Sequence, residues 1–115
     1  FTTMGHINYL STLQFVDGVI GNSSSGLAEA PTFKVGTINI GDRQRGRLKA
    51  KSIIDCNPTK ESIKNAIETL YSENFQMILQ SVENPYGKGN AIEKIMRVLI
   101  KVGIPSEPKK EFYDL

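Results

Sequence analysis

The chain contains 115 residues with a mass of 12.7 kDa, and 14 basic against 12 acidic residues give it a formal net charge of +2. This length suffices for one domain with a modest core, which excludes a self-contained enzyme of two domains. The near-balanced charge requires no polyanionic partner, and no segment approaches the roughly 20 apolar residues of a membrane span. The single cysteine, Cys56, can form neither an internal disulfide nor a multi-thiol metal site, so we expect a cytoplasmic protein without a bound metal.

Apolar residues change their spacing several times in the first half of the chain, so helices and short strands are expected to alternate. Helical spacing predicts helices over 7–15 and 27–33, and Pro31 lies inside the second or ends it. Three short apolar or β-branched runs predict strands: 18–21, 37–40 and 52–56. A polar turn, 22–26, separates the first strand from the second helix.

From Asn57 onward the chain is expected to be helical. Pro58 suits the first turn of a helix, and either Asn57 or Thr59 is the expected N-cap. Apolar residues then recur at helical spacing in three sets, which we expect to line the core: Ile63, Ala66, Ile67 and Leu70; Phe75, Ile78, Leu79 and Val82; Ile92, Ile95, Met96 and Leu99. The last helix should end at Gly103 and Pro105.

Short buried strands that alternate with helices indicate an α/β fold with a partial Rossmann-like parallel sheet. Three strands are few for such a sheet, and the chain begins at Phe1 instead of methionine. We therefore expect a fragment of a longer protein, with further strands upstream. Residues 1–103 are assigned to the folded domain and 104–115 to a charged C-terminal tail.

The turn after the first strand is the strongest chemical signal. Ser23, Ser24 and Ser25 stand between two glycines at the start of a helix. Their hydroxyls, the free backbone N–H groups and the positive end of the helix dipole suit a phosphate or diphosphate. The turn matches neither the lysine-bearing P-loop nor the three-glycine dinucleotide fingerprint. A serine N-cap without any ligand explains the same pattern.

Glu29 follows on the same helix. It completes no capping box, because none of the three serines has Glu or Gln three residues later. A carboxylate that faces a diphosphate is repelled, but one that reaches sideways can accept hydrogen bonds from a neutral diol such as ribose. The alternative is a solvated glutamate that the helix dipole favours.

The loop 41–47, which follows the second strand, is the second signal. In open α/β sheets ligands bind beyond the carboxyl ends of the strands, and Arg43 there can form charge-assisted bonds with phosphate. Basic residues alternate as far as Lys51, but no aromatic residue lies among them for base stacking, so no nucleic-acid partner is expected. His6, the only histidine, is interpreted as a loop residue and Cys56 as a buried packing thiol.

Three segments together point to a family. Residues 21–31 contain Asn-Ser-Ser-Ser-Gly, residues 39–47 contain Gly-Asp-Arg-Gln-Arg-Gly-Arg, and residues 84–90 are Asn-Pro-Tyr-Gly-Lys-Gly-Asn. In this order they resemble the UDP-N-acetylglucosamine 2-epimerases, above all the hydrolysing branch of sialic-acid and legionaminic-acid synthesis. The non-hydrolysing branch typically has Asp-Ser-Gly-Gly at the turn and lacks the arginine-rich loop. The resemblance covers nearly the whole chain, which corresponds to roughly the last third of such an enzyme.

The resemblance implies the end of the C-terminal domain of a GT-B fold, with the substrate between two Rossmann-like halves. The implied contacts are Ser23, Ser24 and Arg43 to the diphosphate of UDP, Glu29 to the ribose, and the loop of Gly5 and His6 near the uracil. The implied reaction is elimination of UDP from UDP-N-acetylglucosamine and hydration to N-acetylmannosamine, with no cofactor. The family's acid–base residues lie upstream, so we expect no catalytic residue here and no activity from this chain alone. The full-length enzyme is expected to be a homo-oligomer.

Three alternatives remain open. The first is a UDP-N,N'-diacetylbacillosamine 2-epimerase. Its substrate differs from UDP-N-acetylglucosamine at C4 and C6 of the sugar, and these groups are expected to contact mainly residues outside this chain. A GT-B glycosyltransferase uses a similar nucleotide-sugar half, although the loop 41–47 favours the epimerase. A non-catalytic nucleotide-binding module is the third.

Overall fold

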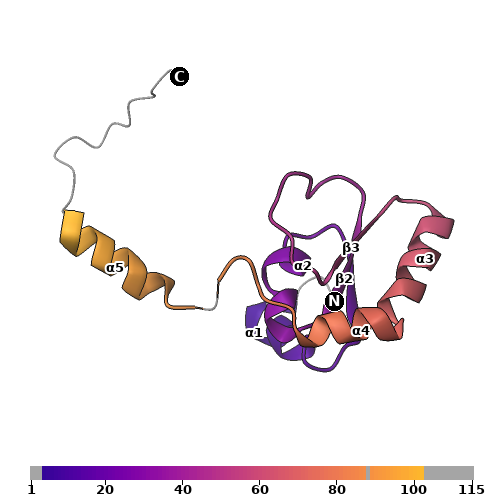
Figure 1. The fold of residues 1–115 in the computed structure, drawn as a ribbon, viewed down its shortest axis with the longest axis horizontal. Coiled ribbons are helices and arrows are strands. Elements are labelled where there is room, and N and C mark those ends of the chain that lie inside the picture. Colours follow the sequence, from indigo (N-terminus) through magenta and orange to yellow (C-terminus); the bar gives the residue numbers. More distant parts are fainter. Residues whose placement is uncertain (1–3, 88, 103–115) are drawn as a thin grey trace, which may run out of the picture.

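The computed structural model describes residues 4–87 and 89–102 (Figure 1). In chain order the elements are α1 (His6–Thr12), β1 (Gly18–Gly21), α2 (Ser25–Ala28), the 3₁₀-helix η1 (Ala30–Phe33), β2 (Gly36–Ile40), β3 (Ile53–Cys56), α3 (Lys60–Leu70), α4 (Glu73–Gln80) and α5 (Ala91–Val102). The predicted end of the last helix at Gly103 and Pro105 and the predicted tail 104–115 lie outside the described residues.

The described strands form one parallel sheet in the order β1-β2-β3. The central strand β2 is the most buried, with residues 36–39 shielded from solvent. The prediction of an α/β fold with a parallel Rossmann-like sheet is therefore confirmed. Because all strands run the same way, the segments that follow Gly21 and Ile40 leave the sheet at the same edge. This topology brings the serine turn and the arginine-rich loop together.

Helices cover both faces of the sheet. On one face Ile38 packs against residues of α3 and α4 in a core cluster of Ile38, Ala66, Leu70, Phe75 and Leu79. Successive strand residues point to opposite faces, so Thr37 lies on the other face, where its hydroxyl donates to the carbonyl of Gly26 in α2 at 3.0 Å. Most of the apolar sets predicted for α3 and α4 thus contribute to the core as expected, but Ile67 is 40% exposed and does not.

The start of α3 resolves the choice between Asn57 and Thr59. Thr59 is the N-cap, and its hydroxyl accepts a hydrogen bond from the backbone N–H of Ser62 at 3.3 Å. This contact satisfies one of the donors that a helix start leaves unpaired.

The helix predicted over 27–33 is wrong in its bounds. It begins two residues earlier, at Ser25, and the α-helix ends after Ala28, where Glu29 separates it from η1. Pro31 explains the break, because it has no N–H with which to continue the α-helical ladder. The first helix is also shorter than predicted: α1 ends at Thr12 instead of residue 15.

The apolar set predicted for α5 does not lie in the core. None of the residues of α5 is buried, and Ile95 is 57% exposed and Leu99 46% exposed. In Figure 1 the helix lies apart from the sheet and from α3 and α4. The pattern predicted an amphipathic helix correctly, but its apolar side packs against nothing in the described residues. None of the described helices combines the length and the apolar character that crossing a membrane demands.

Candidate functional site

Two loops meet at the carboxyl edge of the sheet. Gln44 in the loop after β2 donates its side-chain amide to the backbone carbonyl of Asn22 at 2.7 Å. In the same loop, Arg43 Nη1 lies 3.5 Å from Asn22 Oδ1. Arg43 is exposed and lies beside Asn22, the first residue of the serine turn 22–26. The structure therefore brings Arg43 to Asn22, the residue next to the serines that the sequence singled out as phosphate contacts.

The serine turn keeps hydrogen-bond donors free. Ser24 is the N-cap of α2, but its side chain makes no capping bond. The hydroxyl of Ser23 accepts from the backbone N–H of Ser25 at 3.3 Å, so its own proton can be donated elsewhere. Among residues 4–87 and 89–102, no acceptor pairs with the backbone N–H of Ser23 or Ser24. Hydroxyls and amides with this arrangement suit an anion.

The helix that follows this turn is too short to supply the helix dipole that was expected to favour a phosphate. With four residues, α2 forms a single turn, so aligned peptide dipoles add little positive potential at its start. What the turn offers an anion is therefore its local donors and the nearby charge of Arg43, and little from a helix dipole.

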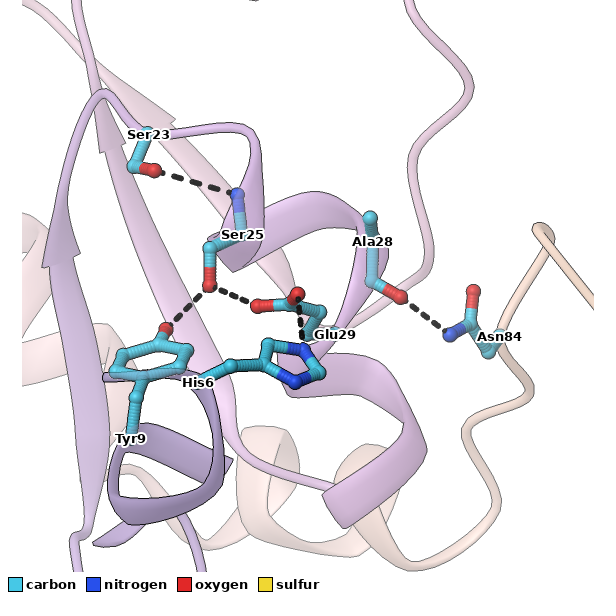
Figure 2. Close-up of polar contacts among 7 residues, drawn as sticks. All are labelled: His6, Tyr9, Ser23, Ser25, Ala28, Glu29 and Asn84. Carbon is cyan, nitrogen blue, oxygen red and sulfur yellow. Dashed lines mark hydrogen bonds and ion pairs between the residues drawn. The ribbon is translucent and has the colours of Figure 1, made fainter. Parts of the chain in front are cut away.

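Glu29 is not the solvated helix residue that the alternative interpretation required (Figure 2). Its side chain is 33% exposed, and Oε2 lies 2.6 Å from the hydroxyl of Ser25. The same hydroxyl lies 2.5 Å from Tyr9 Oη in α1. The second oxygen, Oε1, lies 3.5 Å from His6 Nε2. The carboxylate is thus enclosed by polar groups from two helices.

His6 was interpreted as a loop residue, and this is wrong. It is the first residue of α1, and Gly5 before it has the left-handed φ of 73° that a glycine tolerates at a helix start. The imidazole is directed at Glu29 in Figure 2. Sequence reasoning missed this contact because 23 positions separate the two residues and no local pattern connects them.

Asn84 explains the third motif, which sequence analysis could only match by resemblance. Its amide nitrogen donates to the backbone carbonyl of Ala28 and to Thr32 Oγ1, both at 2.7 Å. Its Oδ1 accepts from the backbone N–H of Tyr86 at 2.9 Å. One side chain therefore attaches the 84–90 segment to the two short helices on either side of Glu29.

An ion pair joins Lys49, which follows the arginine-rich loop, to Asp55 in β3. Asp55 accepts hydrogen bonds from Lys49 Nζ at 2.8 Å and from Asn39 Nδ2 at 2.7 Å. Burial raises the pKa of Asp55, but these two hydrogen bonds and the Lys49 charge outweigh it and hold the pKa below its ordinary value of 3.8. Lys49 is thereby engaged within the fold and is not a free cation of the alternating basic segment.

A pocket of about 500 Å³ opens next to this ion pair, at the ends of β2 and β3. Its lining includes Asp42 and Asp55 but neither Ser23 nor Arg43. The two carboxylates make it unsuitable for a phosphate group. Cys56 also lines it and is only partly buried, contrary to the expected buried thiol. Within the described part of the chain, no group of three or more His, Cys, Asp or Glu residues is placed to hold a metal ion.

The chain is similar to several known proteins over most of its length. It is 46% identical over 110 residues to a polysialic acid biosynthesis protein from Escherichia coli. This alignment covers 94% of this chain and 28% of that protein. It is 40% identical, over an alignment of 116 residues, to a GDP/UDP-N,N'-diacetylbacillosamine 2-epimerase (hydrolyzing) from Campylobacter jejuni. This alignment covers 100% of this chain and 30% of the relative. This chain thus spans less than a third of the length of these relatives.

A solved structure shares the fold. The crystal structure of a UDP-N-acetylglucosamine 2-epimerase superimposes with a TM-score of 0.68 at 18% identity, over 96% of this chain and 31% of that one. The sequence model of the UDP-N-acetylglucosamine 2-epimerase family matches residues 1–100. That match spans most of the chain and includes both loops of the candidate site, so the chain belongs to the UDP-N-acetylglucosamine 2-epimerase family.

Proposed function

We propose that this chain is the C-terminal, UDP-binding part of a hydrolysing UDP-N-acetylglucosamine 2-epimerase. The proximity of Arg43 to a serine turn with unpaired donors is the observation that supports it best. In this proposal Ser23, Ser24 and Arg43 contact the diphosphate, Glu29 contacts the ribose hydroxyls, and Gly5 and His6 lie on the uracil side. The complete enzyme converts UDP-N-acetylglucosamine into UDP and N-acetylmannosamine without NAD or a metal.

The proposed contacts explain how this part of the enzyme contributes to elimination. When the C1–O bond of the sugar breaks, negative charge develops on the departing diphosphate. The guanidinium of Arg43 and the hydroxyls of Ser23 and Ser24 stabilise that charge more as it grows, which lowers the barrier. The groups that remove and add protons at the sugar belong to the upstream part of the enzyme in this proposal, so the isolated chain is inactive.

A second substrate is favoured by two relatives. The Campylobacter jejuni protein and a Legionella pneumophila protein, 29% identical over 100 residues, are both named as hydrolysing diacetylbacillosamine 2-epimerases. The uridine and diphosphate contacts serve either sugar equally, so the choice depends on residues outside this chain. The same UDP-binding role applies to both.

Product analysis of the full-length protein, meaning the complete reading frame that contains this chain, tests the activity. Incubated with UDP-N-acetylglucosamine or UDP-N,N'-diacetylbacillosamine and no NAD or metal, the enzyme should release UDP and a free 2-epimerised sugar, identified by NMR. If the sugar stays attached to UDP, the hydrolysing assignment is wrong.

Calorimetry with UDP tests the site. Arg43→Ala and Glu29→Ala should each weaken UDP binding about tenfold or more, because each removes a charge-assisted hydrogen bond of about 1.5–3 kcal/mol. Arg45→Ala is the matched control, since it removes the same charge from an exposed position of the same loop. Unchanged affinity in both test variants would disprove the site assignment.

A further inference from the structure

The carboxylate of Glu29 is held in one orientation before any ligand binds. Glu29 lies at the break between α2 and η1, with φ −109° and ψ −50°. Its Oε2 lies 2.6 Å from Ser25 Oγ, and Ser25 Oγ lies 2.5 Å from Tyr9 Oη (Figure 2).

Proton counting gives the direction of these bonds. An ionised carboxylate only accepts, so the single hydroxyl proton of Ser25 is donated to Glu29 Oε2. The hydroxyl oxygen of Ser25 is then the acceptor for the phenolic proton of Tyr9. The three side chains form one directed series, from Tyr9 in α1 through Ser25 at the start of α2 to Glu29.

The two oxygens of Glu29 are therefore unequal. Oε2 is occupied by Ser25, which like Tyr9 is half-buried and fixed on a helix. Within the part of the chain that the structure describes, Oε1 has only His6 Nε2 at 3.5 Å, and the His6 side chain is 72% exposed. A contact that long from an exposed side chain is easily replaced. Oε1 is consequently the oxygen that can accept hydrogen bonds from an incoming ligand.

We propose that Ser25 and Tyr9 are positioning residues for recognition of the sugar diol by Glu29. This inference rests on the proposed function, in which Glu29 contacts the ribose hydroxyls of UDP. Neither residue touches the ligand. The Ser25 hydroxyl fixes Oε2 and directs Oε1 outward, and Tyr9 fixes that hydroxyl. Without the Ser25 hydroxyl the carboxylate turns freely about its side-chain torsions, so ordering it costs binding affinity.

Two ligands separate this role from a general structural one. UDP has both ribose hydroxyls, whereas 2′,3′-dideoxy-UDP has neither and so makes no use of the Glu29 carboxylate. In calorimetry with the full-length protein, Ser25→Ala should lower the affinity for UDP about tenfold and Tyr9→Phe about threefold, within the range of hydrogen bonds to charged groups. The affinity for 2′,3′-dideoxy-UDP should not change in either variant. Ser25→Thr keeps the hydroxyl and should retain UDP affinity.

Each other result overturns the proposal. Equal losses for both ligands would show that Ser25 and Tyr9 only support the fold of the turn, and dideoxy-UDP binding therefore serves as the folding control. If Glu29→Gln weakens UDP binding while Ser25→Ala leaves it unchanged, the ribose contact stands and the positioning role fails. If the unmodified protein binds both ligands equally well, the ribose contact of the proposed function fails as well.

Discussion

The side-chain amide of Gln44 donates to the backbone carbonyl of Asn22 across 2.7 Å, and this bond joins the arginine-rich loop to the serine turn. Gln44 is 3% exposed, although its neighbours Arg43 and Arg45 are exposed. The buried side chain of Gln44 thus connects the loop to the turn, whereas the arginines on either side of it point to solvent. We expect the position of the Arg43 guanidinium to depend on that bond, because Arg43 is the adjacent residue in the same loop.

Gln44→Met tests this dependence. Methionine has a similar shape but no donor, so the carbonyl of Asn22 loses its partner and the free energy of unfolding should fall by about 1–3 kcal/mol. UDP affinity of the full-length protein should fall too, because Arg43 is no longer held at the turn. Arg45→Ala, in which an exposed neighbour changes, should alter neither quantity. A Gln44→Met protein with unchanged UDP affinity would show that Arg43 is positioned in another way.

Gly26 in the serine turn permits close packing of α2 on β2. A Cβ atom at this position would lie 2.5 Å from Thr37 Cγ2, which is too close for either group to stay in place. Gly26→Ala should therefore destabilise the chain by about 1–3 kcal/mol, as overpacking does elsewhere, measured by denaturant unfolding.

A second substitution makes this prediction specific. Thr37→Ser removes the obstructing methyl group but keeps the hydroxyl that donates to the Gly26 carbonyl at 3.0 Å. The double variant Gly26→Ala with Thr37→Ser should regain most of the lost stability. If the two changes simply add, the clash between these residues does not explain the glycine.

Much of the fold could be predicted because apolar spacing is a local property. The three strands and the core-facing sets of α3 and α4 follow from residues a few positions apart, such as Ala66 and Leu70. The parallel sheet then places the ends of β1 and β2 at one edge, so the sequence predicts that the serine turn and the loop of Arg43 project from the same edge. Local pattern and topology together therefore predict that the two loops of the candidate site meet at this edge.

The contacts within the site could not be predicted, since they join segments far apart in sequence. Tyr9 meets Ser25 across 16 positions, and Asn84 meets Ala28 across 56. Such pairs depend on how whole helices pack, which no local pattern encodes. The same limit explains the error at α5: helical spacing predicts an apolar side but does not say what covers that side.

Because α5 is exposed, replacing a leucine by alanine should lower the unfolding free energy much less on α5 than in the core. Leu70 is 5% exposed and belongs to the core cluster, so Leu70→Ala should cost about 2–5 kcal/mol of unfolding free energy. Leu99 is 46% exposed on α5, so Leu99→Ala in the 115-residue chain should change the unfolding free energy by less than about 0.5 kcal/mol. A loss at Leu99 as large as that at Leu70 would show that α5 packs against the body of this chain.

Asp55 predicts a pH-dependent contribution to stability. Hydrogen bonds from Lys49 and Asn39 keep its pKa below the ordinary 3.8, so its contribution is fully present above about that pH and is lost as the pH falls through the lower, folded-state pKa. Because the side chain is 53% exposed, Asp55→Asn should cost less than about 1 kcal/mol near neutral pH.

The difference in unfolding free energy between Asp55→Asn and the unmodified chain should therefore stay constant from about pH 7 to pH 5. It should narrow below about pH 4, where the unfolded chain begins to bind a proton at this aspartate, and vanish once the folded aspartate is protonated as well. Urea unfolding at a series of pH values measures it. Lys49→Met removes the other partner of the ion pair and should show the same narrowing, since both variants lose one interaction. A difference that does not vary with pH would mean that Asp55 acts through its shape and its bond with Asn39, and not through its charge.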